Sequence, residues 1–350
     1  MTHHVRREHP HDACAAIVHY LATETDLHKR TLLMEDLHAK SRSLEEGPRQ
    51  RFSDAALATF AAEPESQAAL VPMVDTPEQQ PVDVLVMAVV EIERLALLAA
   101  FDIDAEDPAL FTTESGRRIY ATRVHSRHAG RALDVTLTSL TEPLNVRSAA
   151  TITQLKSRFS AGAYFVIGMA AGLRDKTTVG DVVVPELVHY YEPGRQEPDT
   201  FEPRREVEHV NRVLYRNLSY YEPGDRYFAR VDELLAIADA SRLPDDLPVP
   251  FRPKYHGRNV VLVSGEQLIQ DGRLTREQVR FDERIKAGDQ EAYGAAIGLQ
   301  DATWALFRGI ADYGEHPKPN RYQYVATTAA AVALRDFLET EYEPLGAAEF

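Results

Sequence analysis

Apolar runs of strand length alternate along the chain with segments of helical periodicity, beginning at Val82. The run VDVLVMAVV, residues 82–90, is almost continuously apolar and rich in β-branched residues, a pattern typical of a strand buried on both faces of a parallel sheet. Apolar residues at helical intervals follow up to Phe101. Further strands are predicted near residues 119–125, 132–140, 163–168, 179–184, 259–264 and 304–310, and further helices from about residue 145, from about 292 and over 324–339. The alternation predicts an α/β fold.

The segments outside this alternation indicate how the chain is organised. Residues 12–40 have the pattern of two short amphipathic helices and a third is predicted after Ser53, while PMVDTPEQQP, residues 72–81, has the composition of a linker. We therefore expect a helical N-terminal region over 1–78 and a main domain over 79–345. Residues 190–253 are polar and proline-rich, which predicts a surface excursion with helices near 207–217 and 231–240.

Composition narrows the class of protein. A net charge of -15 over 350 residues argues against a nucleic-acid polymer as partner. The polar, histidine-rich start, the absence of an apolar run of membrane length and the single Cys14 predict a cytoplasmic protein without a disulfide framework. The histidines lack the spacing of metal ligands, so we expect no metal and no cofactor.

Two acidic residues stand out near the end of the alternating pattern. Glu291 lies where a small-residue helix begins, and Asp312 follows the next apolar strand, Trp304 to Ile310. Open α/β sheets bind ligands at the carboxyl ends of their strands, so both acids are expected to face one crevice. The alternative is that Glu291 only complements the helix dipole and Asp312 only forms a turn.

A wider pattern around these acids resembles the late motif of the nucleoside phosphorylase superfamily, and most closely that of the methylthioadenosine/adenosylhomocysteine nucleosidases. The matching residues are Gln290, Glu291, Arg308, Ile310, Ala311 and Asp312, with Gln290 in place of Met and Ala311 in place of Ser. The resemblance implies that Glu291, with Gln290 and Met169, binds the ribose. It also implies that Asp312 donates a proton to N7 of a purine leaving group.

Other segments carry the same resemblance in the same order. Residues 168–172 followed by VGDVVV resemble the superfamily's glycine-rich loop and next strand, and Ser264-Gly265-Glu266 resembles its Ser-Gly-Asp turn. These matches imply that Ala171 and Gly172, with Leu268 and Ile269, contact the base. They place Glu93, with Glu91 as the alternative, where nucleosidases activate water. The resemblance covers roughly residues 82–340 and implies a three-layer α/β/α fold around a mixed sheet.

The function implied is a nucleosidase that hydrolyses the N-glycosidic bond of a purine nucleoside or nucleotide, in a homo-oligomer. Hexameric phosphorylases carry a phosphate-binding arginine where this chain has Val166, which favours water over phosphate as the nucleophile. Arg147, at a predicted helix start, would receive a 5′-phosphate, with Arg94 or Arg117 as the alternatives. A phosphorolytic enzyme and a non-catalytic nucleotide-sensing module are the alternatives, and a redox Rossmann domain lacks its Gly-x-Gly-x-x-Gly turn here. Residues 1–78 would regulate or assemble the enzyme, as in effectors of bacterial stress or antiviral defence.

Overall fold

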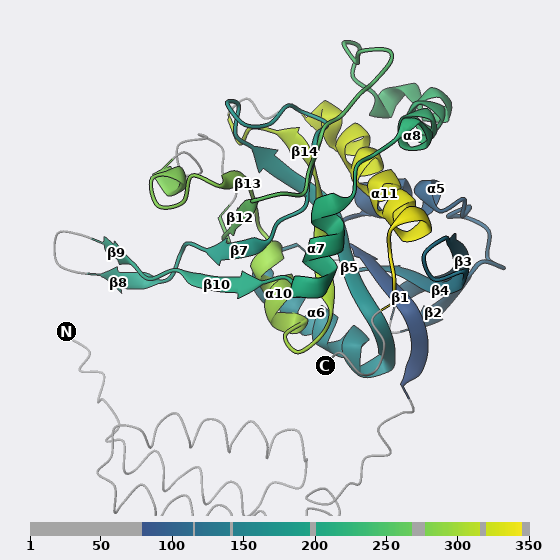
Figure 1. Cartoon of the computed structure of the whole chain (residues 1–350), viewed down its shortest axis with the longest axis horizontal. Coiled ribbons are helices and arrows are strands. Elements are labelled where there is room, and N and C mark those ends of the chain that lie inside the picture. The colour runs from purple at the N-terminus through teal and green to yellow at the C-terminus, as the bar shows by residue number, and fades with distance from the viewer. Residues whose placement is uncertain are drawn as a thin grey trace, which may run out of the picture. The chain divides into compact units, whose positions relative to one another are not determined.

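The chain divides into two compact units, Met1–Glu78 and Gln79–Phe350. The computed structural model describes residues 79–114, 116–140, 143–196, 201–267, 277–315 and 320–344, all in the second unit (Figure 1). The helices predicted before residue 79 lie outside the described residues.

A large mixed sheet forms the centre of the second unit. Its strand order is β10-β7-β12-β13-β5-β1-β4-β3-β2, and β14 pairs with β5 and β6 off this path. The central strands β4, β1, β5 and β14 run parallel, whereas β13 runs antiparallel to β5. The strands of this sheet are β1 (Gln80–Ala88), β2 (Phe111–Glu114), β3 (Arg117–Ser126), β4 (Arg131–Ser139), β5 (Phe159–Gly172), β6 (Val182–Val183), β7 (Leu187–Tyr190), β10 (Glu206–His209), β11 (Tyr255–His256), β12 (Val261–Ser264), β13 (Ile285–Asp289) and β14 (Trp304–Asp312). A separate two-stranded sheet consists of β8 (Gly194–Gln196) and β9 (Phe201–Pro203).

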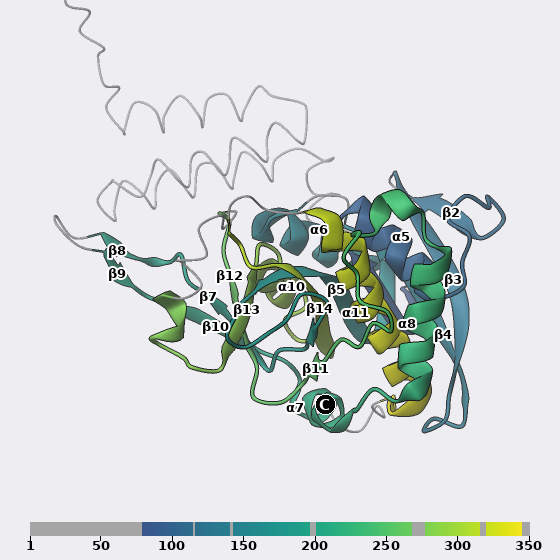
Figure 2. The same cartoon turned by 90° about the horizontal axis from the view of Figure 1, so that it is seen from above.

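Helices flank this sheet in two groups. In one group α5 and α8 both pack against α11, and in the other α6 packs against α10 (Figures 1 and 2). The described helices are α5 (Glu91–Ala100), α6 (Asn145–Arg158), α7 (Arg212–Tyr220), α8 (Asp225–Ile237), α10 (Ala292–Gly298) and α11 (Gln323–Thr340), with 3-10 turns at Ala240–Arg242 and Asn320–Tyr322. The predicted three-layer α/β/α fold with a mixed central sheet is confirmed.

The core strands and helices lie where the apolar pattern placed them, but two local predictions were wrong. The helix expected near 207–217 begins only at Arg212, because the Asn211 side chain caps it by accepting the N–H groups of Val213 and Leu214. Residues 206–209 instead form β10, which pairs with β7. Residues 168–172, expected as a loop, continue β5, because β14 and β13 supply their pairing partners.

The small residues of α10 bring it close to α6. A Cβ added to Gly294 would overlap the carbonyl oxygen of Asn145, the first residue of α6. The Asn145 side chain completes this junction by accepting hydrogen bonds from Gly294 N at 2.8 Å and from Ser264 Oγ at 3.1 Å. The contact fixes the start of α10 beside the ends of β12 and β13, where the candidate site lies.

Among the residues that the structure describes, none of the helices is both long enough and apolar enough to cross a membrane.

Candidate active site

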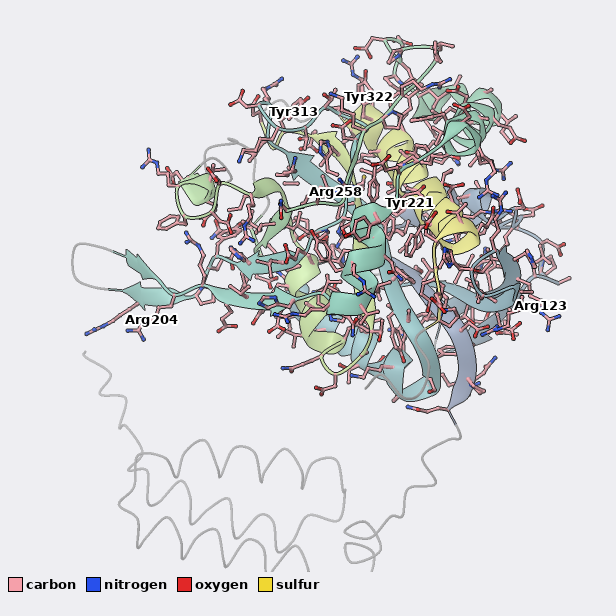
Figure 3. The ribbon with its side chains drawn as sticks, viewed as in Figure 1. Arg123, Arg204, Tyr221, Arg258, Tyr313 and Tyr322 are labelled. Carbon is pink, nitrogen blue, oxygen red and sulfur yellow. The ribbon has the colours of Figure 1, made fainter. Side chains whose placement is uncertain are left out.

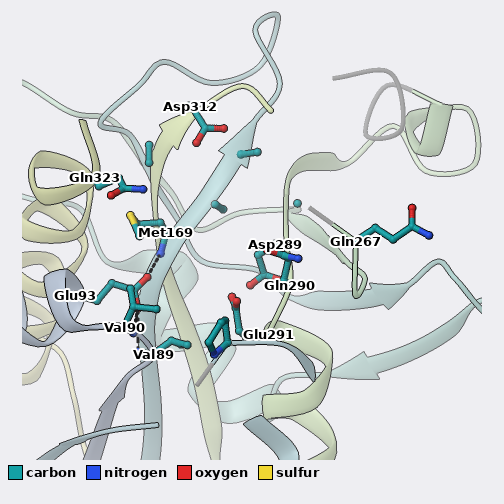
Figure 4. Close-up of a pocket in the computed structure, with 15 residues that line it drawn as sticks. Val89, Val90, Glu93, Met169, Gln267, Asp289, Gln290, Glu291, Asp312 and Gln323 are labelled. Carbon is teal, nitrogen blue, oxygen red and sulfur yellow. Dashed lines mark hydrogen bonds between the residues drawn. The ribbon is translucent and has the colours of Figure 1, made fainter. Parts of the chain in front are cut away.

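A cavity of about 260 Å³ opens at the carboxyl ends of β1, β5, β13 and β14 (Figure 4). Open α/β sheets bind ligands at this edge. Acidic and amide side chains supply most of its polar surface, and no arginine or lysine lies among its described lining residues. The lining consists of Val89, Val90, Glu93, Pro143, Met169, Ala170, Ala171, Gln267, Gly288, Asp289, Gln290, Glu291, Ala311, Asp312 and Gln323.

Glu93 enters the cavity from the first turn of α5. Its carboxylate accepts three backbone N–H groups, from Val89 at 2.9 Å and Val90 at 3.0 Å on Oε2, and from Met169 at 2.9 Å on Oε1. Burial raises the pKa of Glu93, while the Arg308 charge and these three donors oppose the rise. The carboxylate is therefore held rigidly, as a base of increased strength, between the ends of β1 and β5.

Glu91, the alternative to Glu93, points elsewhere. Its carboxylate forms a bidentate pair with Arg94, with contacts of 2.6 and 2.7 Å, and its side chain is 66% exposed. It does not line the cavity, whereas Glu93 is only 3% exposed and does. Of the two glutamates, geometry thus places Glu93 at the site.

Arg308 lies at the base of the site as a fully buried cation on β14. Its Nη2 is 2.8 Å from Asp289 Oδ2 and 4.0 Å from Glu291 Oε2, and the Asp289 contact is an ion pair that does not meet hydrogen-bond geometry. Burial opposes the charge on Arg308, but Asp289, Glu291 and Glu93 raise its pKa on balance. One guanidinium therefore faces three carboxyl groups.

Gly168 makes room for this arrangement. A Cβ at residue 168 would overlap Arg308 Nη1 and would lie 2.9 Å from Glu93 Oε1. The missing side chain thus lets a cation on β14 approach a carboxylate on α5 across β5.

Glu291 immediately precedes α10, and its buried side chain has a strongly raised pKa. Burial, followed by the neighbouring charge of Asp289, raises its pKa to about 8, although Arg308 opposes the rise. Asp289 itself accepts the N–H of Ala292 at 3.1 Å, which fixes the turn that carries Glu291. Glu291 can therefore gain or lose a proton near neutral pH.

Asp312 is the last residue of β14 and is 4% exposed. Its Oδ1 accepts the N–H of Gly314 at 2.7 Å. Figure 4 shows this carboxylate at the end of the cavity opposite Glu291. A ligand bound between Asp312 and Glu291 would therefore meet a carboxyl group of the protein at each end.

The other predicted site residues divide into three groups. Gln290, Met169 and Ala171 line the cavity. Gly172, Arg147 and Arg94 do not: Arg147 is exposed on the first turn of α6, and Arg94 is bound to Glu91 and Tyr120. That Arg147 or Arg94 receives a 5′-phosphate stays a prediction. Leu268 and Ile269 lie outside the described residues.

Sequence reasoning missed three polar residues of the lining, Asp289, Gln267 and Gln323. Asp289 could have been found, because Arg308 interrupts a strand that is otherwise apolar, and a buried arginine requires a carboxylate partner. Gln323 begins α11 and reaches the cavity from a helix far along the chain. No spacing in the sequence indicates that approach.

Comparison with protein-family models and with solved structures concerns the fold of the chain. No protein-family model matches the chain. The S-adenosylhomocysteine nucleosidase from Streptococcus pyogenes in complex with 5-methylthiotubericidin superposes with a TM-score of 0.50 at 16% identity, over 75% of this chain and 98% of that chain. The chain has the nucleoside phosphorylase-like fold. A futalosine hydrolase of Helicobacter pylori strain 26695 gives a TM-score of 0.49 at 13% identity, over 73% of this chain and 96% of that chain.

Sequence comparison finds a relative of greater identity to this nucleoside phosphorylase-like domain. The protein called ATP nucleosidase Cap17, from Escherichia coli strain KTE188, is 29% identical over 265 residues, which cover 73% of this chain and 51% of the relative. The chain thus matches about half the length of that curated relative.

Proposed function

We propose that this chain is a nucleosidase that hydrolyses the N-glycosidic bond of a purine nucleoside or nucleotide and releases the free base. The observation that carries the proposal is the convergence of Glu93, Glu291 and Asp312 in one cavity, although they come from α5, the start of α10 and β14. The name and the 29% identity of ATP nucleosidase Cap17 support it.

Two of the acids take the two chemical roles. Glu93 removes a proton from a water molecule, whose oxygen forms a bond to the sugar C1′ as the C1′–N9 bond breaks. Asp312 donates a proton to N7 of the departing purine, so that the base leaves as a neutral molecule. Each acid or base role of this kind typically contributes about 10² to 10⁴ in rate.

Glu291 binds the ribose between them. Its carboxyl oxygens accept hydrogen bonds from the sugar hydroxyls, and these bonds strengthen as positive charge develops on the ring. Met169 covers the sugar. Gln290 is held at the rim by donating from Nε2 to the Glu266 carbonyl at 2.9 Å, which leaves its amide oxygen available to a ligand.

The charge of the cavity favours water over phosphate as the nucleophile. Phosphate binding needs cations or several N–H donors, and no lysine or arginine belongs to the described lining. Val166, where hexameric phosphorylases carry arginine, is fully buried in β5 and does not reach the cavity. An inorganic phosphate at this site would face carboxylates.

The same charge constrains the substrate. The nucleoside part of a substrate fits the described lining, whereas the phosphates of a nucleotide would lie beyond it. A cytoplasmic location and a homo-oligomeric state complete the proposal, and light scattering of the purified protein tests the second.

The test is base release from a panel that includes adenosine, guanosine, AMP and ATP, with and without inorganic phosphate, followed by chromatography of the products. We expect free purine and free ribose or ribose phosphate, and no ribose 1-phosphate when phosphate is present. Formation of ribose 1-phosphate whenever phosphate is supplied would show a phosphorylase instead.

Variants assign the roles. Asp312→Asn and Glu93→Gln should each lower kcat by at least about a hundredfold, because each removes a group that transfers a proton. Glu91→Gln is the matched control. It removes the same charge two residues away from Glu93, and the Glu91 side chain does not line the cavity. Near-normal turnover by either of the first two variants would contradict the mechanism.

A further inference from the structure

A second cavity of about 520 Å³ lies between the end of α7, the start of α8 and the segment 252–258. It shares no described lining residue with the first cavity. Figure 3 shows Tyr221 and Arg258, which both belong to it. The nucleosidase proposal makes no use of this cavity.

Its charge is opposite to that of the first cavity. Three permanent cations, Arg252, Lys254 and Arg258, line it with one carboxylate, Glu222, on a chain whose net charge is -15. A concentration of positive side chains on an acidic protein attracts anions locally.

These cations retain donors for a ligand. Arg252 uses Nη1 for Asp232 and for its neighbour's carbonyl, both at 2.7 Å. Arg258 uses Nε for the Ser219 carbonyl at 2.6 Å and Nη2 for Glu222 at 3.4 Å. The Lys254 ammonium makes no hydrogen bond or ion pair within the part of the chain that the structure describes, which makes it the most available of the three.

Aromatic rings supply much of the remaining wall. Tyr221, Phe228 and Tyr255 line the cavity, and the rings of Tyr221 and Tyr255 meet edge to face with centroids 5.0 Å apart. The Arg252 guanidinium lies 5.2 Å from the centre of the Phe228 ring. A flat ring can pack on such walls while an attached anion meets the cations.

His256 ties the cavity to the sheet. Its Nδ1 accepts from Lys286 Nζ at 3.2 Å, so that Nε2 donates to Asp181 Oδ2 at 2.9 Å. The backbone carbonyl of Asp181 accepts the N–H of Ile310 in β14 at 2.8 Å. Both imidazole nitrogens are therefore occupied, and the available donors are those of the three cations.

From these observations we infer that the second cavity is a binding site for a small phosphate monoester that carries an aromatic ring. The phosphate contacts Lys254 and Arg258, and the ring packs against Phe228 and Tyr255. The site is separate from the candidate active site, so the inference does not depend on the nucleosidase proposal.

Phenyl phosphate is the probe, because it has the required ring and anion but no glycosidic bond to cleave. Isothermal titration of the full chain should show saturable binding of phenyl phosphate, weaker binding of inorganic phosphate and none of phenol. The affinity should fall as salt is added, because the contacts are charged. Saturable binding of phenol equal to that of phenyl phosphate, or no binding of phenyl phosphate, would overturn the inference.

Variants locate the site. Lys254→Glu and Lys254→Gln should each weaken phenyl phosphate binding by roughly tenfold or more, since a charge-assisted contact is lost. Arg123→Glu is the matched control: it makes the same charge change on β3, where Arg123 is exposed and pairs with Asp134 (Figure 3). Glu291→Gln, in the first cavity, should leave the affinity unchanged.

Circular dichroism of each variant shows whether it is folded like the wild type. If Lys254→Glu is folded and binds as tightly as wild type, or if Arg123→Glu weakens binding as much, the inference is wrong. Loss of binding in Glu291→Gln would likewise overturn it, by placing the probe in the first cavity.

Discussion

At the scale of single residues, the candidate site carries an excess of negative charge. Glu93, Asp289 and Glu291 surround a single buried guanidinium, that of Arg308. Three ionised carboxylates cannot be compensated by one cation in a poorly solvated space, so one of them takes up a proton most readily. Glu291 has that role, because burial and Asp289 raise its pKa to about 8.

This perturbation predicts how stability depends on pH. The pKa of Glu291 is higher in the folded protein, at about 8, than its ordinary 4.5, so the folded state binds the proton more tightly than the unfolded state. The stability that Glu291 contributes is fully present below about pH 4.5 and is lost as pH rises through 8. Glu291→Gln removes this dependence, so its free energy of unfolding should rise relative to wild type between pH 5 and pH 9, by on the order of a few kcal/mol.

Urea unfolding of both proteins at these two pH values measures the difference. Glu91→Gln is the control, because Arg94 holds the pKa of Glu91 below its usual value, so that this variant should gain nothing at high pH. A constant difference between Glu291→Gln and wild type across the range would contradict the assigned pKa.

At the level of elements, the contact between α10 and α6 positions Glu291. Gly294→Ala should destabilise the protein by roughly 1–3 kcal/mol, because the added Cβ meets the backbone of Asn145 and overpacks the contact. The shift of α10 should also lower base release. Urea unfolding and the nucleoside assay measure the two effects.

Gly298→Ala is the matched control on the same helix. There the nearest atoms to an added Cβ are the Ala149 carbonyl oxygen and the Ile152 side chain, each 3.0 Å away. Small adjustments accommodate that distance, so Gly298→Ala should cost clearly less than Gly294→Ala. Equal costs would show that close packing at residue 294 is not what positions the helix.

The elements themselves could be predicted from sequence where burial is complete. β1 and β14 are nearly continuous apolar runs of strand length, and α11 is a long helix rich in alanine, so length and composition indicate the type of each element. The region 206–220 could not be divided correctly, because β10 forms only through pairing with β7 and the α7 boundary depends on the Asn211 cap.

In the candidate site, too, some residues could be predicted from the sequence and others could not. The two acids of the late motif and Glu93 could be found because each lies at or just after a strand end, in a pattern that resembles a known superfamily. The choice between Glu93 and Glu91 required the structure, since both occupy the first turn of α5 and only side-chain direction separates them. The positions of Arg147 and Arg94 likewise depend on side-chain direction.

On the scale of the whole molecule, the described unit separates two kinds of charge. The cavity around Glu93, Glu291 and Asp312 presents carboxylates, and the cavity around Lys254 presents cations. Ligands of different charge would therefore be directed to different parts of one domain.

The two compact units of the chain lead to a last prediction. Every described residue of the candidate site belongs to Gln79–Phe350. A chain without residues 1–78 should therefore fold. At a protein concentration at which it is fully assembled, it should release base with an unchanged kcat/KM.

Light scattering then distinguishes the two roles proposed for the first unit. If it serves assembly, the mass falls and any loss of activity follows dissociation, reversing at high protein concentration. If it serves regulation, the mass and the basal activity are both retained. Loss of activity in a folded chain of unchanged mass would contradict both, because it would mean that the first unit supplies part of the site.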